Sequence, residues 1–149
     1  MTAVLDYPAR KVFVRDICKS IRLRNPEIDG NEGIGKKHKE WKVECNGVEF
    51  MVTVVWIQGL VTEVNKEEGF LILDDSTGKV KVLGYNKIPY ISPSVDIGKY
   101  VMVVASMVRS GELPMVNAIK LQDLSRVRNA EQSWSLEVMD QILHLSSIH

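Results

Sequence analysis

Strict alternation of apolar and polar residues begins at Trp41 and marks the first strong β-strand signal in the chain. Trp41, Val43 and Cys45 alternate with charged neighbours, and the same period resumes beyond Asn46-Gly47. A period of two places one set of side chains on one face of a strand. Asn-Gly suits a two-residue hairpin turn, because both turn residues must adopt positive φ. The pattern therefore predicts a β-hairpin.

The stretch Phe50–Val64 is long, rich in β-branched residues and interrupted by Gly59. A glycine inside a long strand often marks a bulge or a sharp bend. A bent strand can pair with two sets of neighbours, as a small closed barrel requires. We therefore expect this stretch to form the first strand of such a barrel.

Four further strands follow at short spacing, with an acidic turn, Asp74–Gly78, between the first two. They are predicted at Phe70–Leu73, Lys79–Leu83, Tyr100–Val108 and Met115–Leu121. Five principal strands with connections this short fit antiparallel or Greek-key pairing. Together with a helical pattern at the C-terminus, they predict an all-β protein, a five-stranded OB-fold barrel with a C-terminal α-helix.

The domain organisation follows from changes in composition along the chain. Residues 1–10 are predicted to be a flexible N-terminus, 11–128 the OB-fold domain, and 129–149 a C-terminal interaction helix and tail. Segment 22–40 holds several turn and breaker signals, and we expect a mobile loop there. Its basic cluster, Lys36–Lys39, suits a nuclear-import signal, a phosphate contact or a solvated loop.

The C-terminal helix is the most informative part of the sequence. Asn129 is expected to cap it, with Gln132 completing a capping box. Its apolar residues form two stripes that together span roughly 200°, about twice the arc that docks one helix on one core. The excess predicts an interface with another subunit, although a helix packed deeply into its own domain, or a frayed tail, is the alternative. The candidate interface residues are Trp134, Val138, Ile142 and Leu145 in the first stripe, and Leu136, Met139 and Leu143 in the second.

Charge and aromatic content argue against nucleic-acid binding by the isolated chain. Of the 149 residues, nineteen are basic and nineteen acidic, so no basic excess is available to neutralise phosphates. OB folds that bind single strands stack bases on several aromatic side chains. The central predicted hairpin offers only Phe70, which is more typical of a core position.

No residue pattern indicates catalysis or a bound metal. Asp74 and Asp75 are adjacent, so they point to opposite faces and form a solvated turn rather than an acid/base pair. Cys18 and Cys45 are expected to be buried thiols, and the three histidines lack the spacing of metal ligands. We expect no enzymatic activity, no cofactor and no metal. The N-terminus lacks an apolar signal core, and no apolar run is long enough for a membrane span, which predicts a soluble intracellular protein.

Four sequence blocks occur in the order and spacing found in one known family. They are Val-Trp-Ile-Gln-Gly at 55–59, Gly-Lys-Tyr-Val-Met-Val at 98–103, Ala-Ile-Lys-Leu-Gln-Asp-Leu-Ser at 118–125 and Ser-Trp-Ser-Leu-Glu-Val at 133–138. From about Val54 to Leu145 the chain resembles the RecQ-mediated genome instability protein 2 family. A more distant likeness to the middle subunit of replication protein A agrees with the OB fold.

The resemblance implies a nuclear, non-catalytic adaptor subunit. Members of the family pair with RecQ-mediated genome instability protein 1 through an OB–OB contact and a C-terminal helix bundle. The pair joins topoisomerase III-alpha and the Bloom-type RecQ helicase in dissolving double Holliday junctions, and the small subunit has little affinity for DNA. The alternative is a direct single-stranded DNA-binding subunit of the replication protein A type.

The resemblance also implies a peptide site. The family's lysine and tryptophan that match Lys120 and Trp134 help to receive a peptide of the Fanconi anaemia M helicase. Lys120 ends the fifth predicted strand and Trp134 opens the helix, so the two side chains are expected side by side at the barrel edge. In the alternative, Trp134 caps the barrel core and Lys120 is solvated.

Overall fold

The computed structural model describes residues 9–23, 40–88 and 95–148. The expectations for a flexible N-terminus within 1–8, for a mobile loop within 24–39 and for its basic cluster lie outside the described residues. The elements in chain order are β1 (Arg10–Lys11), α1 (Val14–Cys18), β2 (Ile21–Arg22), β3 (Trp41–Cys45), β4 (Val48–Val52), β5 (Val54–Asn65), β6 (Phe70–Asp74), β7 (Lys79–Leu83), the 3-10 helix η3 (Tyr85–Lys87), β8 (Tyr100–Arg109), β9 (Met115–Asp123) and α3 (Ala130–Ile148).

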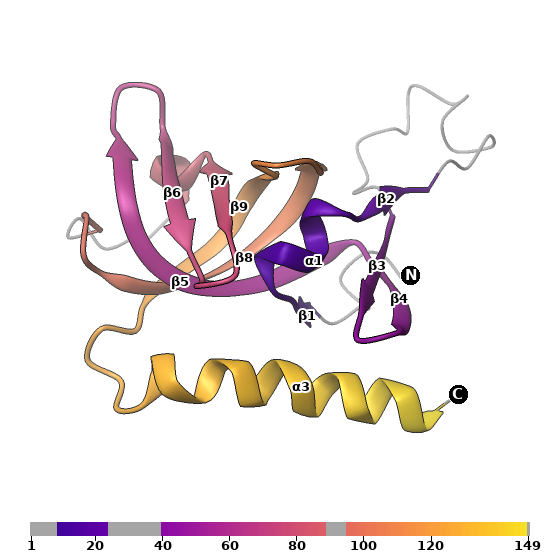
Figure 1. Ribbon diagram of the computed structural model, residues 1–149. Helices are drawn as coiled ribbons and strands as arrows, with labels where there is room; N and C mark the ends of the chain where they lie inside the picture. Colours follow the sequence, from indigo (N-terminus) through magenta and orange to yellow (C-terminus); the bar gives the residue numbers. More distant parts are fainter. Residues whose placement is uncertain (1–8, 24–39, 89–94, 149) are drawn as a thin grey trace, which may run out of the picture.

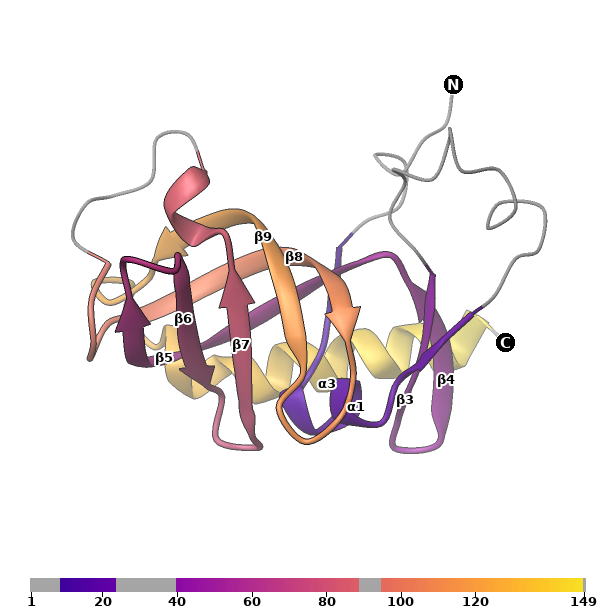
Figure 2. The ribbon, with the colours of Figure 1, turned by 90° about the horizontal axis from the view of Figure 1, so that it is seen from above.

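A barrel closes because β5 pairs with neighbours on both of its edges. The hydrogen-bonded order is β5-β6-β7-β9-β8, and β8 pairs again with β5. The β7–β9 pair is parallel, and the other pairs of the barrel are antiparallel. This five-stranded Greek-key closure confirms the predicted OB-fold barrel. Figures 1 and 2 show β5 sweeping along the whole barrel, with α3 as a separate layer on one side.

Gly59 lies where β5 changes partners, as its position in the sequence predicts. Val54–Leu60 pairs with β8, and Leu60–Asn65 pairs with β6. A Cβ atom on Gly59 would lie 2.8 Å from the carbonyl oxygen of Asp74 at the end of β6. Because backbone rather than a movable side chain fills that space, only glycine lets the two strands approach this closely.

The expected single strand over Phe50–Val64 is wrong, because the chain breaks at Thr53. The part before the break belongs to β4, which pairs with β3 in a separate three-stranded sheet with β2. The predicted hairpin turn between β3 and β4 is confirmed: Asn46 has φ 51° and Gly47 has φ 82°. Figure 1 shows this small sheet beside the barrel, so the alternating pattern continues across two different sheets.

The acidic turn between β6 and β7 holds the N-terminal segment in place. The Asp75 carboxylate accepts hydrogen bonds from the backbone N–H groups of Val14, Thr77 and Gly78 and from the Thr77 hydroxyl, at 2.6–3.1 Å. The first of these bonds fixes the start of α1, whose Ile17 is fully buried in the core. The expectation of a merely solvated turn is therefore wrong for Asp75, which lies partly buried and ties two distant segments together.

Both ends of the expected loop at 22–40 belong to paired backbone. Arg22 belongs to β2 and pairs with Trp41 of β3. The backbone N–H of Leu23 donates to the carbonyl of Glu40 at 2.9 Å. Strand pairing therefore extends to both ends of the segment, and only 24–39 lies outside the described residues.

The buried-thiol prediction is confirmed for Cys45, which is 2% exposed. Burial, followed by the neighbouring Asp16 carboxylate, raises the pKa of the Cys45 thiol to about 11. Cys18 is only half-buried, and both cysteines are free thiols. Cys45 therefore stays protonated at neutral pH and acts as a small apolar core residue.

Gly59→Ala is expected to destabilise the fold by about 1–3 kcal/mol, because the added methyl group meets a backbone carbonyl that cannot move aside. Gly78→Ala is the comparison variant, since its Cβ would lie 3.1 Å from the Val14 side chain, a milder contact than the 2.8 Å to backbone at Gly59. Urea denaturation followed by circular dichroism measures both variants. A Gly59→Ala protein as stable as the Gly78→Ala protein would contradict the close approach of β5 and β6.

Candidate functional site

The C-terminal helix α3 packs one apolar stripe against its own domain. Trp134, Val138, Ile142 and Leu145 are all buried and belong to the main hydrophobic core. The helix lies along β1, β4 and β5, as the layer beneath the barrel in Figure 1. These four residues are therefore covered by the chain itself, which corrects their assignment to a partner-subunit interface.

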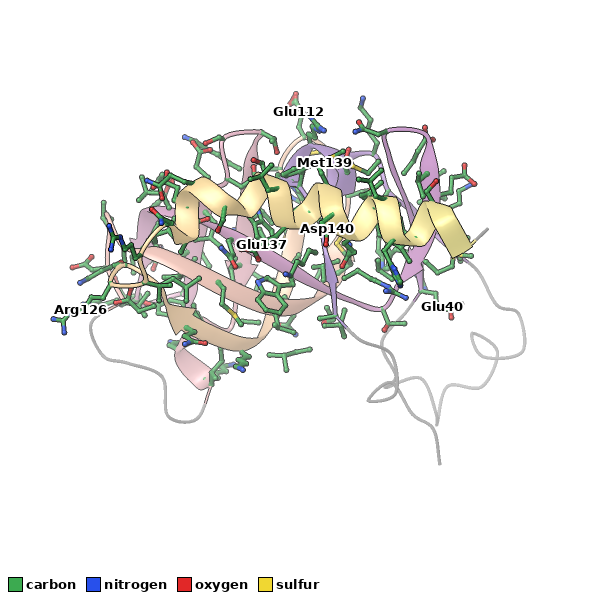
Figure 3. All side chains as sticks on the ribbon, turned by 90° about the horizontal axis from the view of Figure 1, so that it is seen from below. Glu40, Glu112, Arg126, Glu137, Met139 and Asp140 are labelled. Carbon is green, nitrogen blue, oxygen red and sulfur yellow. The ribbon has the colours of Figure 1, made fainter. Side chains whose placement is uncertain are left out.

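Two residues of the second apolar stripe face away from the barrel, and the third, Met139, packs against the edge of the core. Leu136 is 71% exposed and Leu143 is 67% exposed, whereas Met139 is half-buried. The Met139 sulfur lies 3.5 Å from the Asn46 side-chain amide of the small sheet. Figure 3 shows Met139 on the flank of the helix that faces the side of Glu112. Of the seven predicted interface residues, these three remain available to a partner, and their role there stays a prediction.

Polar contacts to β1 fix the opposite flank of α3. The Gln141 side chain forms two hydrogen bonds with the backbone of Lys11, accepting from its N–H at 2.9 Å and donating to its carbonyl at 2.8 Å. The Lys11 ammonium pairs with the Glu137 carboxylate at 3.0 Å. Figure 3 places Glu137 on the flank away from Met139. These contacts set the rotation of the helix about its own axis.

The helix does not begin with the expected capping box. Asn129 has φ 63°, in the left-handed region, whereas an N-cap side chain reaches back from extended backbone. Within the first turn, the Ser133 hydroxyl lies in donor range of the Ala130 carbonyl at 3.4 Å and of the Glu137 carboxylate at 3.0 Å, the shorter contact, and it donates to acceptors rather than capping the free N–H groups. The chain reverses direction between β9 and α3, and this turn requires the positive φ at Asn129.

Trp134 faces a shallow hollow of about 410 Å³ at the start of α3. Its indole N–H is buried and has no hydrogen-bond partner in the described part of the chain. Tyr100 also faces the hollow. Burial raises the pKa of the Tyr100 hydroxyl, although its hydrogen bond with Gln58 opposes this shift. The remaining lining residues are Phe13, Arg15, Asp74, Asp75, Ser76, Thr77, Glu131, Ser135 and Met139.

Lys120 lies in different surroundings from Trp134. Strand β9 bulges at Ile119, because Lys120 pairs with Val104 while Ala118 pairs with Ala105. Because of the bulge, Lys120 lies on the opposite face of β9 from Val116 and Ala118. Simple alternation along the strand predicts that all three share one face. Lys120 is exposed and does not line the Trp134 hollow. Trp134 caps the core while Lys120 is solvated, and a joint role in peptide binding stays a prediction.

The pairing between strands places a different tryptophan, Trp56, in line with Lys120 across the sheet. Trp56 of β5 pairs with Val104 of β8, and Val104 pairs with Lys120. Trp56 lies in the Val-Trp-Ile-Gln-Gly block at 55–59, and the sequence alone does not mark it as a site residue. Its neighbours Val55 and Ile57 are fully buried, so the period-two pattern alone directs Trp56 to the outer face of the barrel.

The comparison with protein families settles the relationship of this chain. The family model described as RecQ-mediated genome instability protein 2 matches residues 8–142. The chain belongs to this family. A RecQ-mediated genome instability protein 2 from Gallus gallus is 34% identical over 107 residues, covering 71% of this chain and 78% of the relative. One from Bos taurus is 36% identical over 94 residues, covering 63% of this chain and 59% of the relative.

Similar solved structures confirm that this family member has the OB fold. A chain of the S. pombe Stn1–Ten1 complex matches with a TM-score of 0.65 at 17% identity, covering 95% of this chain and 96% of its own. A chain of a replication protein A heterotrimer bound to single-stranded DNA matches with a TM-score of 0.63 at 13% identity, covering 93% and 98%. At these identities the likeness concerns the fold, and family membership places the chain among genome-maintenance proteins.

Within this family member, the barrel face that carries Phe70 offers little for stacking a base. Phe70 is 9% exposed, and the Lys81 ammonium lies 4.2 Å from the centre of its ring. Among the described residues, no group of His, Cys, Asp and Glu could hold a metal ion. None of the helices in the described ranges is long and apolar enough to cross a membrane.

Trp134→Ala is expected to cost about 3–5 kcal/mol of stability, because it removes a buried indole from the contact between α3 and the barrel. Leu136→Ala, two positions along the same helix, is expected to change stability by less than about 0.5 kcal/mol. Thermal and urea denaturation of both variants measure the difference. Equal losses would contradict the assignment of the two stripes to core and solvent.

Proposed function

We propose that this chain is a non-catalytic adaptor subunit that pairs with RecQ-mediated genome instability protein 1. In this proposal the pair supports topoisomerase III-alpha and the Bloom-type RecQ helicase in dissolving double Holliday junctions in the nucleus. The observation that carries the proposal is the exposed stripe Leu136–Met139–Leu143 on a helix that its other contacts already hold in place. The family relationship supplies the identity of the partners.

The exposed stripe supports pairing on energetic grounds. Fully burying one leucine side chain stabilises a contact by about 1.5–3 kcal/mol. Leu136 and Leu143 lie two helical turns apart, with Met139 on the turn between them, which is the spacing that a partner helix can follow. Because α3 is already ordered by Lys11 and Gln141, binding would not need to order it again.

The similar structures support a role in assembly. One is of a Stn1–Ten1 complex and the other of a replication protein A heterotrimer, so both matching chains come from assemblies of several subunits. A C-terminal helix beside an OB barrel can add its free face to a bundle without disturbing the barrel. We therefore assign the subunit contact to α3 and not to the closed barrel.

A peptide of the Fanconi anaemia M helicase is the proposed second partner. Lys120 supports this role, because it is exposed and, among the described residues, forms no ion pair or hydrogen bond. Trp134 would act indirectly, by holding α3 against the barrel edge. This assignment keeps the residues that the family relationship suggests and gives each a role consistent with its burial.

Replacing Leu136 and Leu143 together with aspartate is expected to abolish pairing with RecQ-mediated genome instability protein 1, since burying unpaired charge in a dry interface is strongly unfavourable. The wild-type chain alone is expected to self-associate through the same stripe, and the double variant to be monomeric. Co-purification and size-exclusion chromatography with light scattering measure both. Lys66→Glu, on the exposed β5–β6 turn, makes the same change of net charge away from the helix. Unchanged pairing by the folded double variant would overturn the proposal.

The alternative function is direct binding of single-stranded DNA, as by a replication protein A subunit. With Phe70 covered by Lys81 and no net positive charge, we expect no saturable binding of a labelled oligonucleotide below roughly 10 µM at low salt. Fluorescence anisotropy at stated salt concentrations measures this. Submicromolar binding that weakens steeply with salt, and that Lys81→Ala reduces, would favour the alternative.

A further inference from the structure

Strand β4 of the small sheet has one open edge. The strand order is β2-β3-β4, so among the described strands β4 has a neighbour on one side only. It is also the longest edge strand in the described ranges, with five residues against two in β1 and two in β2. Figure 1 shows the β3–β4 hairpin beside the barrel, at the end of the molecule where α3 ends. An open edge of this kind offers backbone groups to another strand.

The hydrogen bonds of β3 decide which backbone groups of β4 point to this edge. The Leu23 N–H donates to the Glu40 carbonyl, so every second residue of β3, counted from Glu40, bonds toward β2. The residues between them, beginning with Trp41, therefore bond toward β4. The two-residue turn at Asn46-Gly47 requires the same pattern, because the residues that flank such a turn bond to each other.

On β4, the groups that point away from β3 belong to Glu49 and Met51. The residues of β4 that bond to β3 are Val48, Phe50 and Val52. Both Glu49 and Met51 are exposed, and no described residue outside the β3–β4 ladder bonds to their backbone. The open edge therefore presents two N–H and two C=O groups at the spacing of one strand.

The chain protects its edge at β1 but not its edge at β4. On β1, the Gln141 side chain bonds to the N–H and the carbonyl of Lys11. Edge strands are otherwise protected by lysine, by proline or by a bulge. Strand β4, Val-Glu-Phe-Met-Val, contains neither lysine nor proline, and its pairing with β3 has no register shift. It is therefore able to pair with an added strand.

Two carboxylates lie opposite each other on the outer face of this hairpin. Glu44 and Glu49 are partners in register, and both are exposed. Like charges directly opposite each other destabilise a sheet. The Lys42 ammonium lies 3.8 Å from the Glu49 carboxylate, whereas no cation of the described residues forms an ion pair with Glu44. A net negative charge therefore remains beside the open edge.

An apolar row lies next to these carboxylates on the same face. Ile21, Lys42 and Met51 are partners in register across β2, β3 and β4. Ile21 is 56% exposed and Met51 is 53% exposed. Along the edge of β4, the outer face thus presents a carboxylate at Glu49 and an apolar side chain two residues later at Met51.

We propose that β4 binds an extended segment of a partner protein as an additional strand of the small sheet. The segment runs antiparallel to β4, because opposite residues then exchange both hydrogen bonds and satisfy the open groups of Glu49 and Met51. Its sequence carries an apolar residue opposite Met51, one residue opposite Phe50, and then a lysine or arginine opposite Glu49. Backbone pairing supplies the affinity, and the alternate side chains supply the specificity.

Charge distinguishes such a segment from a second copy of this chain. Strand β4 contains no lysine or arginine, so β4 of a second copy cannot place a cation opposite Glu49. The antiparallel self-pairing that matches all five residues places Glu49 opposite Met51 and leaves the carboxylates uncompensated. A basic segment supplies the charge that the edge lacks. This inference goes beyond the proposed function, which uses α3 and Lys120.

Hydrogen exchange at individual backbone amides tests the pairing directly. The ¹⁵N-labelled full chain is mixed with a synthetic peptide that carries Ile-Val-Lys between threonines, with both ends blocked. The amide protons of Glu49 and Met51 are expected to exchange fast in the free chain and to slow by at least about tenfold with the peptide. The Phe50 amide, which bonds to β3, is expected to be protected in both states.

Modified peptides separate backbone pairing from charge. Methylation of the lysine backbone nitrogen removes a donor to the carbonyl of Glu49, and it is expected to abolish the protection. Methylation of the valine nitrogen, which points away from β4, is expected to leave the protection unchanged. A peptide with glutamate in place of lysine is expected to give no protection, because it adds a third carboxylate to the pair.

Two variants of the chain test the same edge. Glu49→Lys is expected to weaken binding of the lysine peptide by about tenfold and to favour the glutamate peptide instead. Glu67→Lys, on the exposed β5–β6 turn, makes the same change of charge elsewhere and is expected to bind like wild type. Met51→Pro removes an open N–H without removing a bond to β3, so it is expected to prevent strand addition. Protection of the Phe50 amide reports that each variant is folded.

The possible failures are distinguishable. If the Glu49 and Met51 amides stay fast at the highest soluble peptide concentration, the edge does not bind such a segment and the inference fails. If they are slow without peptide and become fast on dilution, a second copy occupies the edge. If the peptide moves the resonances of Leu136 and Leu143 instead, it binds α3. If folded Met51→Pro protein no longer pairs with RecQ-mediated genome instability protein 1, the edge belongs to the subunit contact. Each of the last three outcomes overturns the inference, and none removes the proposed pairing itself.

Discussion

The two hydrogen bonds between the Gln141 side chain and the backbone of Lys11, called the clamp below, fix how α3 is placed on the barrel. The direction of its exposed stripe depends on this placement. Strand β1 is an edge strand, with one side paired to β5 and the other open. Gln141 satisfies the N–H and the carbonyl on the open side, as a neighbouring strand would. A helix side chain thereby covers a sheet edge that would otherwise be free to pair with another chain. The same two bonds act together with the buried stripe of Trp134, Val138, Ile142 and Leu145 to fix which face of α3 meets the barrel.

That rotation separates the two binding surfaces of the proposed function. Met139 lies on one flank of α3, and Glu137, which pairs with Lys11 of β1, lies on the other (Figure 3). Lys120 lies on β9 and not on the strands β1, β4 and β5 that α3 packs along, so the proposed subunit site and the proposed site for the Fanconi anaemia M helicase peptide are formed by different elements. Loss of the clamp is expected to disturb the stripe, since its direction depends on how α3 sits on β1, and to leave Lys120 on β9 in place.

Features determined by local sequence were predictable, and features set by long-range contacts were not. Asn46-Gly47 and Gly59 carry their conformational requirements in their own chemistry, so the hairpin and the bend follow from sequence. The helix period likewise predicts two stripes. Which stripe is buried depends on long-range packing against the barrel and on contacts such as that of Gln141 with Lys11, 130 positions away. The direction of Lys120 depends on a bulge at Ile119, and an alternating pattern cannot indicate where a strand gains one residue.

The use of polar groups inside the fold argues for an adaptor. Asp75 accepts four hydrogen bonds, three from within the β6–β7 turn and one from the Val14 N–H that ties this turn to α1. Hydrogen bonds from Ser125 lower the pKa of Asp123, where the chain leaves β9 for α3. These carboxylates hold segments of the chain together, so their acceptor capacity is used within the molecule. Leu136, Leu143 and Lys120, by contrast, lie exposed on the outside of the fold, where they suit contacts with other proteins.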